Sequence, residues 1–123
     1  GVIEYEDLFC DMLDPAAVSD VGLRSTTRAT NRIEWSLSAG EVAAMDTAYT
    51  LEADELVTIN CTYSPRTADL DFGLITPDGT FRFTSGSNGS IHTTIRVNET
   101  GNYYFTVRNN TSRTVEVLGY VYY

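Results

Sequence analysis

Apolar and polar residues alternate with a period of two from residue 31 almost to the C-terminus. This period places one set of side chains on one face of a β-strand, whereas an amphipathic helix requires a period near 3.6. The alternation recurs in eight stretches, of which residues 42 to 51 are the least regular. The chain is therefore predicted to be all-β, and helix-rich and parallel βαβ folds are excluded. The side chains expected to point inward are Ile33, Trp35, Leu37, Val42, Ala44, Thr47, Tyr49, Leu51, Val57, Ile59, Cys61, Tyr63, Leu70, Phe72, Leu74, Phe81, Phe83, Ile91, Thr93, Ile95, Val97, Tyr103, Phe105, Val107, Val115, Val117, Val121 and Tyr123.

Turn-forming residues separate these stretches. Examples are Ala39-Gly40, Thr76-Pro77-Asp78-Gly79 and Glu99-Thr100-Gly101-Asn102. Proline fixes φ, aspartate offers a side-chain acceptor, and glycine tolerates positive φ, so Pro77 to Gly79 suits a tight reversal. Seven to eight short strands joined by such turns predict an antiparallel two-sheet sandwich, because the apolar face of each sheet must be covered by another.

The N-terminal part has a different composition. Residues 1 to 20 carry six acids and no base, and the apolar residues Tyr5, Leu8, Phe9, Met12 and Leu13 follow helical spacing as far as Pro15. Residues 19 to 31 have no period and are typical of a linker. Residues 1 to 31 are thus expected to be an acidic extension and linker with a short helix, and residues 32 to 123 to be the β-sandwich domain.

Charge and composition exclude several classes of function. The 123 residues contain 17 acids and 8 bases, for a formal charge of −9, which argues against binding a nucleic-acid backbone. All the bases are arginines, so Schiff-base and P-loop lysine chemistry is excluded. No apolar run approaches the roughly 20 residues of a membrane span. No zinc-ligand spacing or phosphate-binding loop is present, and the single histidine, His92, has no partner at a spacing known for nucleophilic catalysis.

Three stretches resemble the bacterial pre-peptidase C-terminal (PPC) domain family and, more distantly, the luminal Golgi-dynamics type of β-sandwich. They are Leu51-Glu-Ala-Asp-Glu-Leu-Val-Thr-Ile59, Asp69-Leu-Asp-Phe-Gly-Leu-Ile-Thr-Pro-Asp-Gly-Thr80 and Glu99-Thr-Gly-Asn-Tyr-Tyr-Phe-Thr-Val-Arg-Asn109. The resemblance covers residues 32 to 123 and implies an eight-stranded, jelly-roll-like sandwich. Similar sandwiches follow membrane-embedded zinc peptidases of the β-lactam-sensor type in Gram-positive bacteria, which indicates one candidate parent protein.

The resemblance also implies a function. Such domains are extracytoplasmic, non-catalytic modules of larger secreted or membrane-anchored bacterial proteins. We therefore expect a module that binds a protein, a cell-wall component or a glycan. The alternatives are a purely stabilising appendage of an exported peptidase and, from the enzyme class, a hydrolase that uses Asp69 and Asp71 as paired carboxylates.

Strand phase predicts one surface rich in arginine and tyrosine. Both residue types are common at binding hot spots, because they combine rigid or planar area with hydrogen-bond donors. Ordinary cross-strand pairing on a solvated sheet would explain the same pattern. The residues expected on this binding surface are Arg82, His92, Arg96, Tyr104, Arg108, Tyr120 and Tyr122.

Three acids form a candidate calcium site. Some relatives in the PPC family bind calcium, and Asp69, Asp71 and Asp78 could supply carboxylate oxygens, which Ca²⁺ prefers. The simpler interpretation is that Asp69 and Asp71 are solvated acids on an outward strand face. No other cofactor is expected.

The two cysteines, Cys10 and Cys61, allow one disulfide. Alternatively, Cys61 is a small buried apolar residue in phase with Val57 and Ile59. Near the C-terminus, Gly101 permits a sharp corner, and Tyr103 could bury its ring while its hydroxyl bonds the backbone, as in a tyrosine corner.

Overall fold

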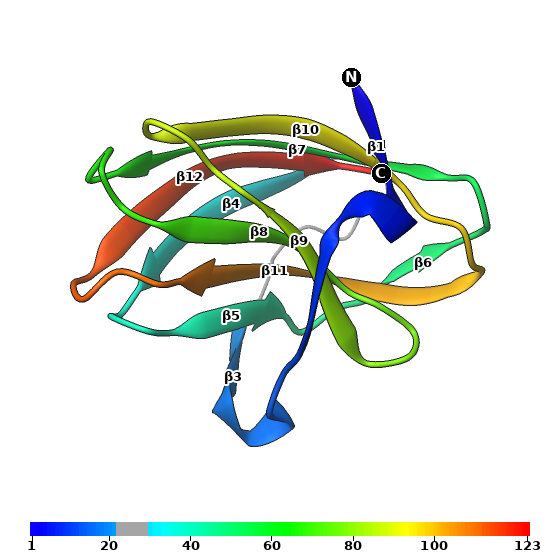
Figure 1. Ribbon diagram of the computed structural model, residues 1–123, viewed down its shortest axis with the longest axis horizontal. Coiled ribbons are helices and arrows are strands. Elements are labelled where there is room, and N and C mark those ends of the chain that lie inside the picture. Colours follow the sequence, from blue (N-terminus) through cyan, green and yellow to red (C-terminus); the bar gives the residue numbers. More distant parts are fainter. Residues whose placement is uncertain (22–29) are drawn as a thin grey trace.

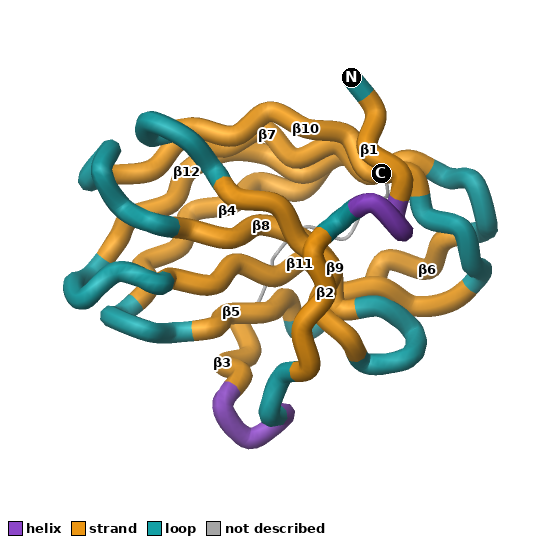
Figure 2. The backbone as a smooth tube through the Cα atoms, in the orientation of Figure 1, coloured by secondary structure: helices purple, strands orange, loops and turns teal. Residues whose placement is uncertain are grey.

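The computed structural model describes residues 1–21 and 30–123, which form a β-sandwich of two sheets (Figures 1 and 2). The five-stranded sheet has the order β1 (Val2–Glu4), β10 (Ser90–Arg96), β7 (Leu56–Ser64), β12 (Val115–Tyr122), β4 (Thr30–Leu37). The seven-stranded sheet has the order β2 (Phe9–Met12), β9 (Thr80–Ser85), β8 (Leu70–Ile75), β11 (Gly101–Asn109), β5 (Val42–Met45), β3 (Val18–Val21), with β6 (Tyr49–Leu51) also paired to β11. Two short 3₁₀ turns, η1 (Tyr5–Asp7) and η2 (Pro15–Ala17), complete the described elements. The predicted all-β sandwich is confirmed, and no helix in this part of the chain is long and apolar enough to cross a membrane.

The core lies between the two sheets and consists mainly of the predicted inward side chains. Trp35 of β4 packs on Phe105 of β11 with ring centroids 5.4 Å apart, and Tyr63 of β7 packs on Phe72 of β8 at 5.9 Å. Each pair joins one sheet to the other. Phe72, Phe105 and the neighbouring Val117 are fully buried. Each aromatic contact of this kind stabilises the fold by about 0.5–1.5 kcal/mol beyond the free energy gained from burying its apolar area.

Strand β11 explains why the irregular stretch 42 to 51 forms two strands. Gly101 to Tyr103 pair with β6, and Thr106 to Arg108 pair with β5. The break between β5 and β6 falls at residues 46 to 48, so each short strand follows a different half of the same long partner. The sequence predicted seven or eight strands. Because of this split and three further N-terminal strands, the described residues contain twelve.

The N-terminal segment is built into the sandwich, and the helix predicted before Pro15 does not form. Strand β1 pairs with β10 in the five-stranded sheet, in parallel. Strand β2 pairs with β9 at one edge of the seven-stranded sheet, and β3 pairs in parallel with β5 at its other edge. Both sheets are therefore mixed rather than purely antiparallel. The helical spacing was misleading, because Tyr5 and Leu8 are buried in the core, whereas Phe9 and Met12 on β2 are 67% and 80% exposed. The linker predicted from residue 19 begins inside β3, and most of it lies outside the described residues.

Two strands have the phase opposite to the prediction. In β5, Ala43 and Met45 are in the core, whereas Val42 and Ala44, which were expected there, pair with Arg108 and Thr106 on the outer side. The second strand is β9. Arg82 pairs with Leu74, whose side chain is in the core between the sheets, while Phe81 and Phe83 pair with Ile75 and Gly73. Phe81 and Phe83 therefore lie on the outer side of the seven-stranded sheet. They are nonetheless buried, and their rings contact each other with centroids 4.8 Å apart.

The expected tyrosine corner is present. The ring of Tyr103 is fully buried, and its hydroxyl donates a hydrogen bond to the carbonyl oxygen of Glu99 at 2.5 Å. Burial raises the pKa of this hydroxyl to about 12. The interaction closes the turn between β10 and β11.

Candidate functional site

The seven residues predicted to form one surface lie on two different sheets. His92, Arg96, Tyr120 and Tyr122 are on β10 and β12 of the five-stranded sheet, whereas Arg82, Tyr104 and Arg108 are on β9 and β11 of the seven-stranded sheet. Strand phase separates inward from outward side chains, but it does not say to which sheet a strand belongs. The single surface predicted from the sequence is therefore wrong.

Four of these residues do lie together on the outer side of the five-stranded sheet. There, the cross-strand register aligns Tyr120 of β12, Asn60 of β7 and His92 of β10 in one row, and Tyr122, Thr58 and Thr94 in the next row. The rings of Tyr120 and Tyr122 are 6.3 Å apart and 25° from parallel. We call this patch the tyrosine face; its residues are Thr58, Asn60, Thr62, His92, Thr94, Leu118, Tyr120 and Tyr122.

The tyrosine face combines exposed apolar area with an uncharged centre. Leu118, Tyr120 and Tyr122 are 50%, 43% and 38% exposed. Their neighbours on β7 and β10 are hydroxyl, amide and imidazole side chains, and the hydroxyls of Thr58 and Thr94 are hydrogen-bonded at 2.9 Å. This patch therefore presents broad, flat area with many hydrogen-bonding groups.

Among the described residues, the charged side chains nearest the tyrosine face lie at its edges, where Arg32 and Glu34 of β4 are in register with Tyr120 and Leu118, and where Glu116 precedes Leu118 on the outer side of β12. Arg96 pairs with Glu4 of β1 at 2.8 Å, which neutralises the arginine predicted to take part in binding. On the opposite margin, Arg32 and Glu34 of β4 are 3.5 Å apart. An uncharged, aromatic centre with a charged rim is the usual anatomy of a protein interface.

Arg108 has a structural environment on the other sheet. Its guanidinium donates to Asp71 through Nε at 2.9 Å and to Asp11 of β2 through Nη2 at 2.8 Å, and it lies over the rings of Phe81 and Phe83. Hydrogen bonds to both carboxylates raise the pKa of Arg108, against the effect of its partial burial. The guanidinium of Arg82 lies 4.6 Å from the centroid of the Tyr5 ring. Both arginines therefore hold the N-terminal segment to the sheet.

The three candidate calcium ligands do not form a site. Asp71 is 4% exposed and accepts hydrogen bonds from Arg108, Asn110 and Ser85, so the solvated carboxylate expected there is also wrong. Asp69 lies before the start of β8, and Asp78 lies beyond its other end, where Thr76 and Thr80 donate to it. No cluster of metal-ligating side chains occurs among the described residues. The same contacts remove Asp71 from the acid–base role that the hydrolase alternative required.

Cys10 and Cys61 are free thiols and do not form the disulfide allowed by the sequence. Cys10 is exposed on β2, whereas Cys61 is buried on β7 in the opposite sheet. Burial raises the pKa of the Cys61 thiol to about 12, so it behaves as the small apolar residue of the alternative interpretation.

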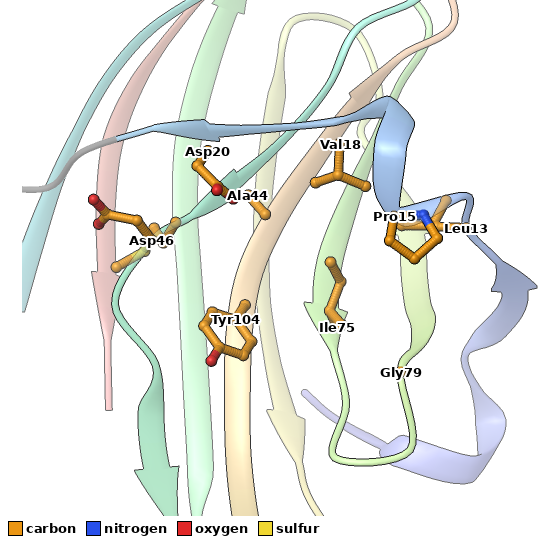
Figure 3. A pocket seen from close by; sticks show the side chains of 10 residues that line it. Leu13, Pro15, Val18, Asp20, Ala44, Asp46, Ile75, Gly79 and Tyr104 are labelled. Carbon is orange, nitrogen blue, oxygen red and sulfur yellow. The ribbon is translucent and has the colours of Figure 1, made fainter.

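A pocket that the sequence did not indicate lies on the outer side of the seven-stranded sheet (Figure 3). Its volume is about 410 Å³. The N-terminal segment forms one wall with Leu13, Pro15 and Val18, while Ile75 and Tyr104 belong to β8 and β11. Asp20 and Asp46 lie at the end opposite Leu13 and Pro15. The pocket was not predictable, because the segment that closes it was expected to be a separate extension.

Comparison with solved structures identifies a similar fold in two bacterial proteins. One is PliG of Aeromonas hydrophila, a periplasmic lysozyme inhibitor of g-type lysozyme, with a TM-score of 0.59 and 11% identity over 85% of this chain and 96% of that one. Another is the pre-peptidase C-terminal domain of a collagenase from Bacillus anthracis, with a TM-score of 0.55 and 13% identity over 84% of this chain and 93% of that one. No protein-family model and no curated protein sequence matches the chain. The likeness supports the PPC-like β-sandwich fold expected from the sequence.

Proposed function

We propose that this chain is a non-catalytic, extracytoplasmic binding module that docks a partner protein through the tyrosine face. The observation that carries the proposal is the uncharged centre of that face, with Tyr120, Tyr122 and Leu118 exposed on a protein whose formal charge is −9. A solvated sheet surface that served only solubility would carry charged residues there. Tyrosine offers large, rigid contact area at a small entropy cost, and clustered aromatic residues dominate binding energy at interfaces.

The charge distribution indicates which kind of protein would bind. The acids nearest the tyrosine face, Glu34 and Glu116, lie at its edge beside Leu118, so they would attract a partner from the rim of the interface. We infer a partner with a basic rim around a neutral patch. Association with such a partner would slow as salt increases, whereas dissociation would depend mainly on the tyrosines.

The fold neighbours support the extracytoplasmic setting. One is the domain of a collagenase, and the other is a periplasmic protein that inhibits a lysozyme, which shows that this fold can serve protein binding. A parent of the membrane-embedded zinc peptidase type stays a prediction, which the full-length sequence would test.

The proposal can be tested by site-specific cross-linking in the organism that makes the chain. The photoreactive residue p-benzoylphenylalanine replaces Tyr120, and the adducts are identified by mass spectrometry. We expect a discrete protein adduct that is lost when the same group replaces Met12, which is 80% exposed on the other sheet. With the partner purified, Tyr122→Ala should weaken binding about 10-fold or more, and Met12→Ala should leave it unchanged. Adducts with glycan alone, or equal adducts at the two positions, would overturn the proposal.

A further inference from the structure

The pocket on the seven-stranded sheet has the size and polarity of a ligand site. Its volume of about 410 Å³ falls within the roughly 300–1,000 Å³ of specific ligand pockets. Apolar side chains line one part of the pocket, and the carboxylates of Asp20 and Asp46 line the other part. The apolar residues are Leu13, Pro15, Val18 and Ile75. A ligand that fills it would therefore have an apolar group next to a cationic one.

The two acids at the pocket differ from most acids of the N-terminal segment. Glu4 pairs with Arg96, Glu6 accepts from Asn98, Asp11 pairs with Arg108, and Asp14 accepts from the backbone N–H of Ala16. Asp20 and Asp46, by contrast, are exposed and have no ion pair with any residue in the described part of the chain, although Asp46 accepts a hydrogen bond from the hydroxyl of Thr47 at 3.2 Å. Their negative charge is thus available to a cation in the pocket.

Tyr104 adds a second element that favours a cation. Its half-buried ring lies between the acidic end and Ile75 (Figure 3). The face of a tyrosine ring attracts ammonium and guanidinium groups by about 0.5–1 kcal/mol at exposed sites. Aliphatic stems of lysine and arginine also pack well on apolar walls while their charged ends stay near water.

We propose that this pocket binds a short peptide segment of a partner protein in which an apolar side chain is next to a lysine or an arginine. The apolar side chain would contact Leu13, Val18 and Ile75, and the cation would lie between Tyr104 and the carboxylates of Asp20 and Asp46. A bare diamine could use the acids but not the apolar wall. The proposal does not rest on the tyrosine face, because the pocket lies on the opposite sheet.

The test uses the whole chain and the labelled peptide acetyl-Gly-Leu-Lys-Gly-amide, with binding followed by fluorescence anisotropy at low salt. In a second peptide, norleucine replaces lysine, which keeps the aliphatic stem and removes the charge. We expect the norleucine peptide to bind about 10-fold more weakly. Asp20→Asn and Asp46→Asn should each weaken binding of the lysine peptide about 3-fold or more, and both should leave the norleucine peptide unaffected.

Asp7→Asn is the matched control, because Asp7 is exposed in the same acidic segment but does not line the pocket. It should change binding of neither peptide. Equal affinity for the two peptides, or equal effects of Asp7→Asn and Asp20→Asn, would overturn the proposal. Binding of 1,5-diaminopentane as tight as that of the lysine peptide would also overturn it, because the apolar wall would then contribute nothing.

Discussion

Asp11 and Arg108, 97 residues apart in the chain, are joined by a hydrogen-bonded ion pair of 2.8 Å. The pair connects the acidic N-terminal segment to the middle of the seven-stranded sheet. It lies over Phe81 and Phe83, which would otherwise be exposed on the outer side of that sheet. The acids of the segment thus have a structural use that composition alone does not reveal.

Loss of Arg108 is expected to be strongly destabilising. Arg108→Met would leave the buried carboxylate of Asp71 without its cation, and breaking such a pair costs about 3–5 kcal/mol. Urea denaturation would measure the loss. The control is Arg32→Met. The side chains of Arg32 and Glu34 are each 68% exposed, so their ion pair should contribute less than about 1 kcal/mol to stability. Adding Asp71→Asn to Arg108→Met should restore part of the stability; a fully additive double variant would contradict this account.

The tyrosine corner predicts a smaller effect. Tyr103→Phe keeps the buried ring but removes the hydroxyl that donates to the Glu99 carbonyl. The free energy of unfolding should fall by about 1 kcal/mol. Thermal denaturation of Tyr103→Phe is compared with that of Tyr122→Phe, whose ring is exposed and whose stability should not change. Equal melting temperatures for the two variants would show that the corner contributes nothing.

Asp78 should make stability depend on pH in the acid range. Hydrogen bonds from Thr76 and Thr80 lower the pKa of Asp78 to about 2 in the folded protein, from an ordinary value of 3.8. A lowered carboxyl pKa gives stability that is present above the unfolded value and is lost as the pH falls from about 4 to about 2. Asp78→Asn should remove this component of the acid denaturation curve. Asp7→Asn should keep it, and identical acid dependence in the two variants would refute the assignment.

The two thiols should differ sharply in reactivity. The thiolate is the reactive form, and Cys61 combines burial with a pKa raised to about 12, whereas Cys10 is exposed. In the native protein, Ellman's reagent should modify one thiol rapidly, and the second should react only after unfolding. Cys10→Ser should abolish the rapid phase. A protein that shows no reactive thiol until a reductant is added would instead contain a disulfide.

Local sequence pattern predicted the strands and the core well. Residues such as Trp35, Phe105 and Val117 alternate with polar neighbours, and each is buried between the sheets. The Tyr103 corner was also predictable, because a glycine two residues before a tyrosine has a local structural meaning. These features depend on residues close in the sequence.

Features that depend on long-range pairing were predicted poorly. The Phe81-Arg82-Phe83 pattern shows that the two rings share a face, but pairing with β8 determines which face it is. Because the Phe9 ring and the Arg108 guanidinium both lie against Phe83 on the outer side, both sides of β9 are partly buried. Long-range pairing also explains why the predicted binding surface was wrong. Tyr104 and Tyr120 have the same phase, but their strands belong to different sheets. The pocket depends on the path of residues 13 to 18, which no short pattern in the sequence describes.

The segment anchored by Asp11 also supplies Leu13, Pro15 and Val18 to the pocket wall. Salt would therefore weaken peptide binding in two ways. It would screen the attraction between the peptide cation and the pocket carboxylates, and it would weaken the Asp11–Arg108 ion pair that anchors the segment forming the pocket wall. Conversely, a bound peptide would hold the N-terminal segment against the seven-stranded sheet. Proteases should then cleave both the segment and the bound peptide more slowly.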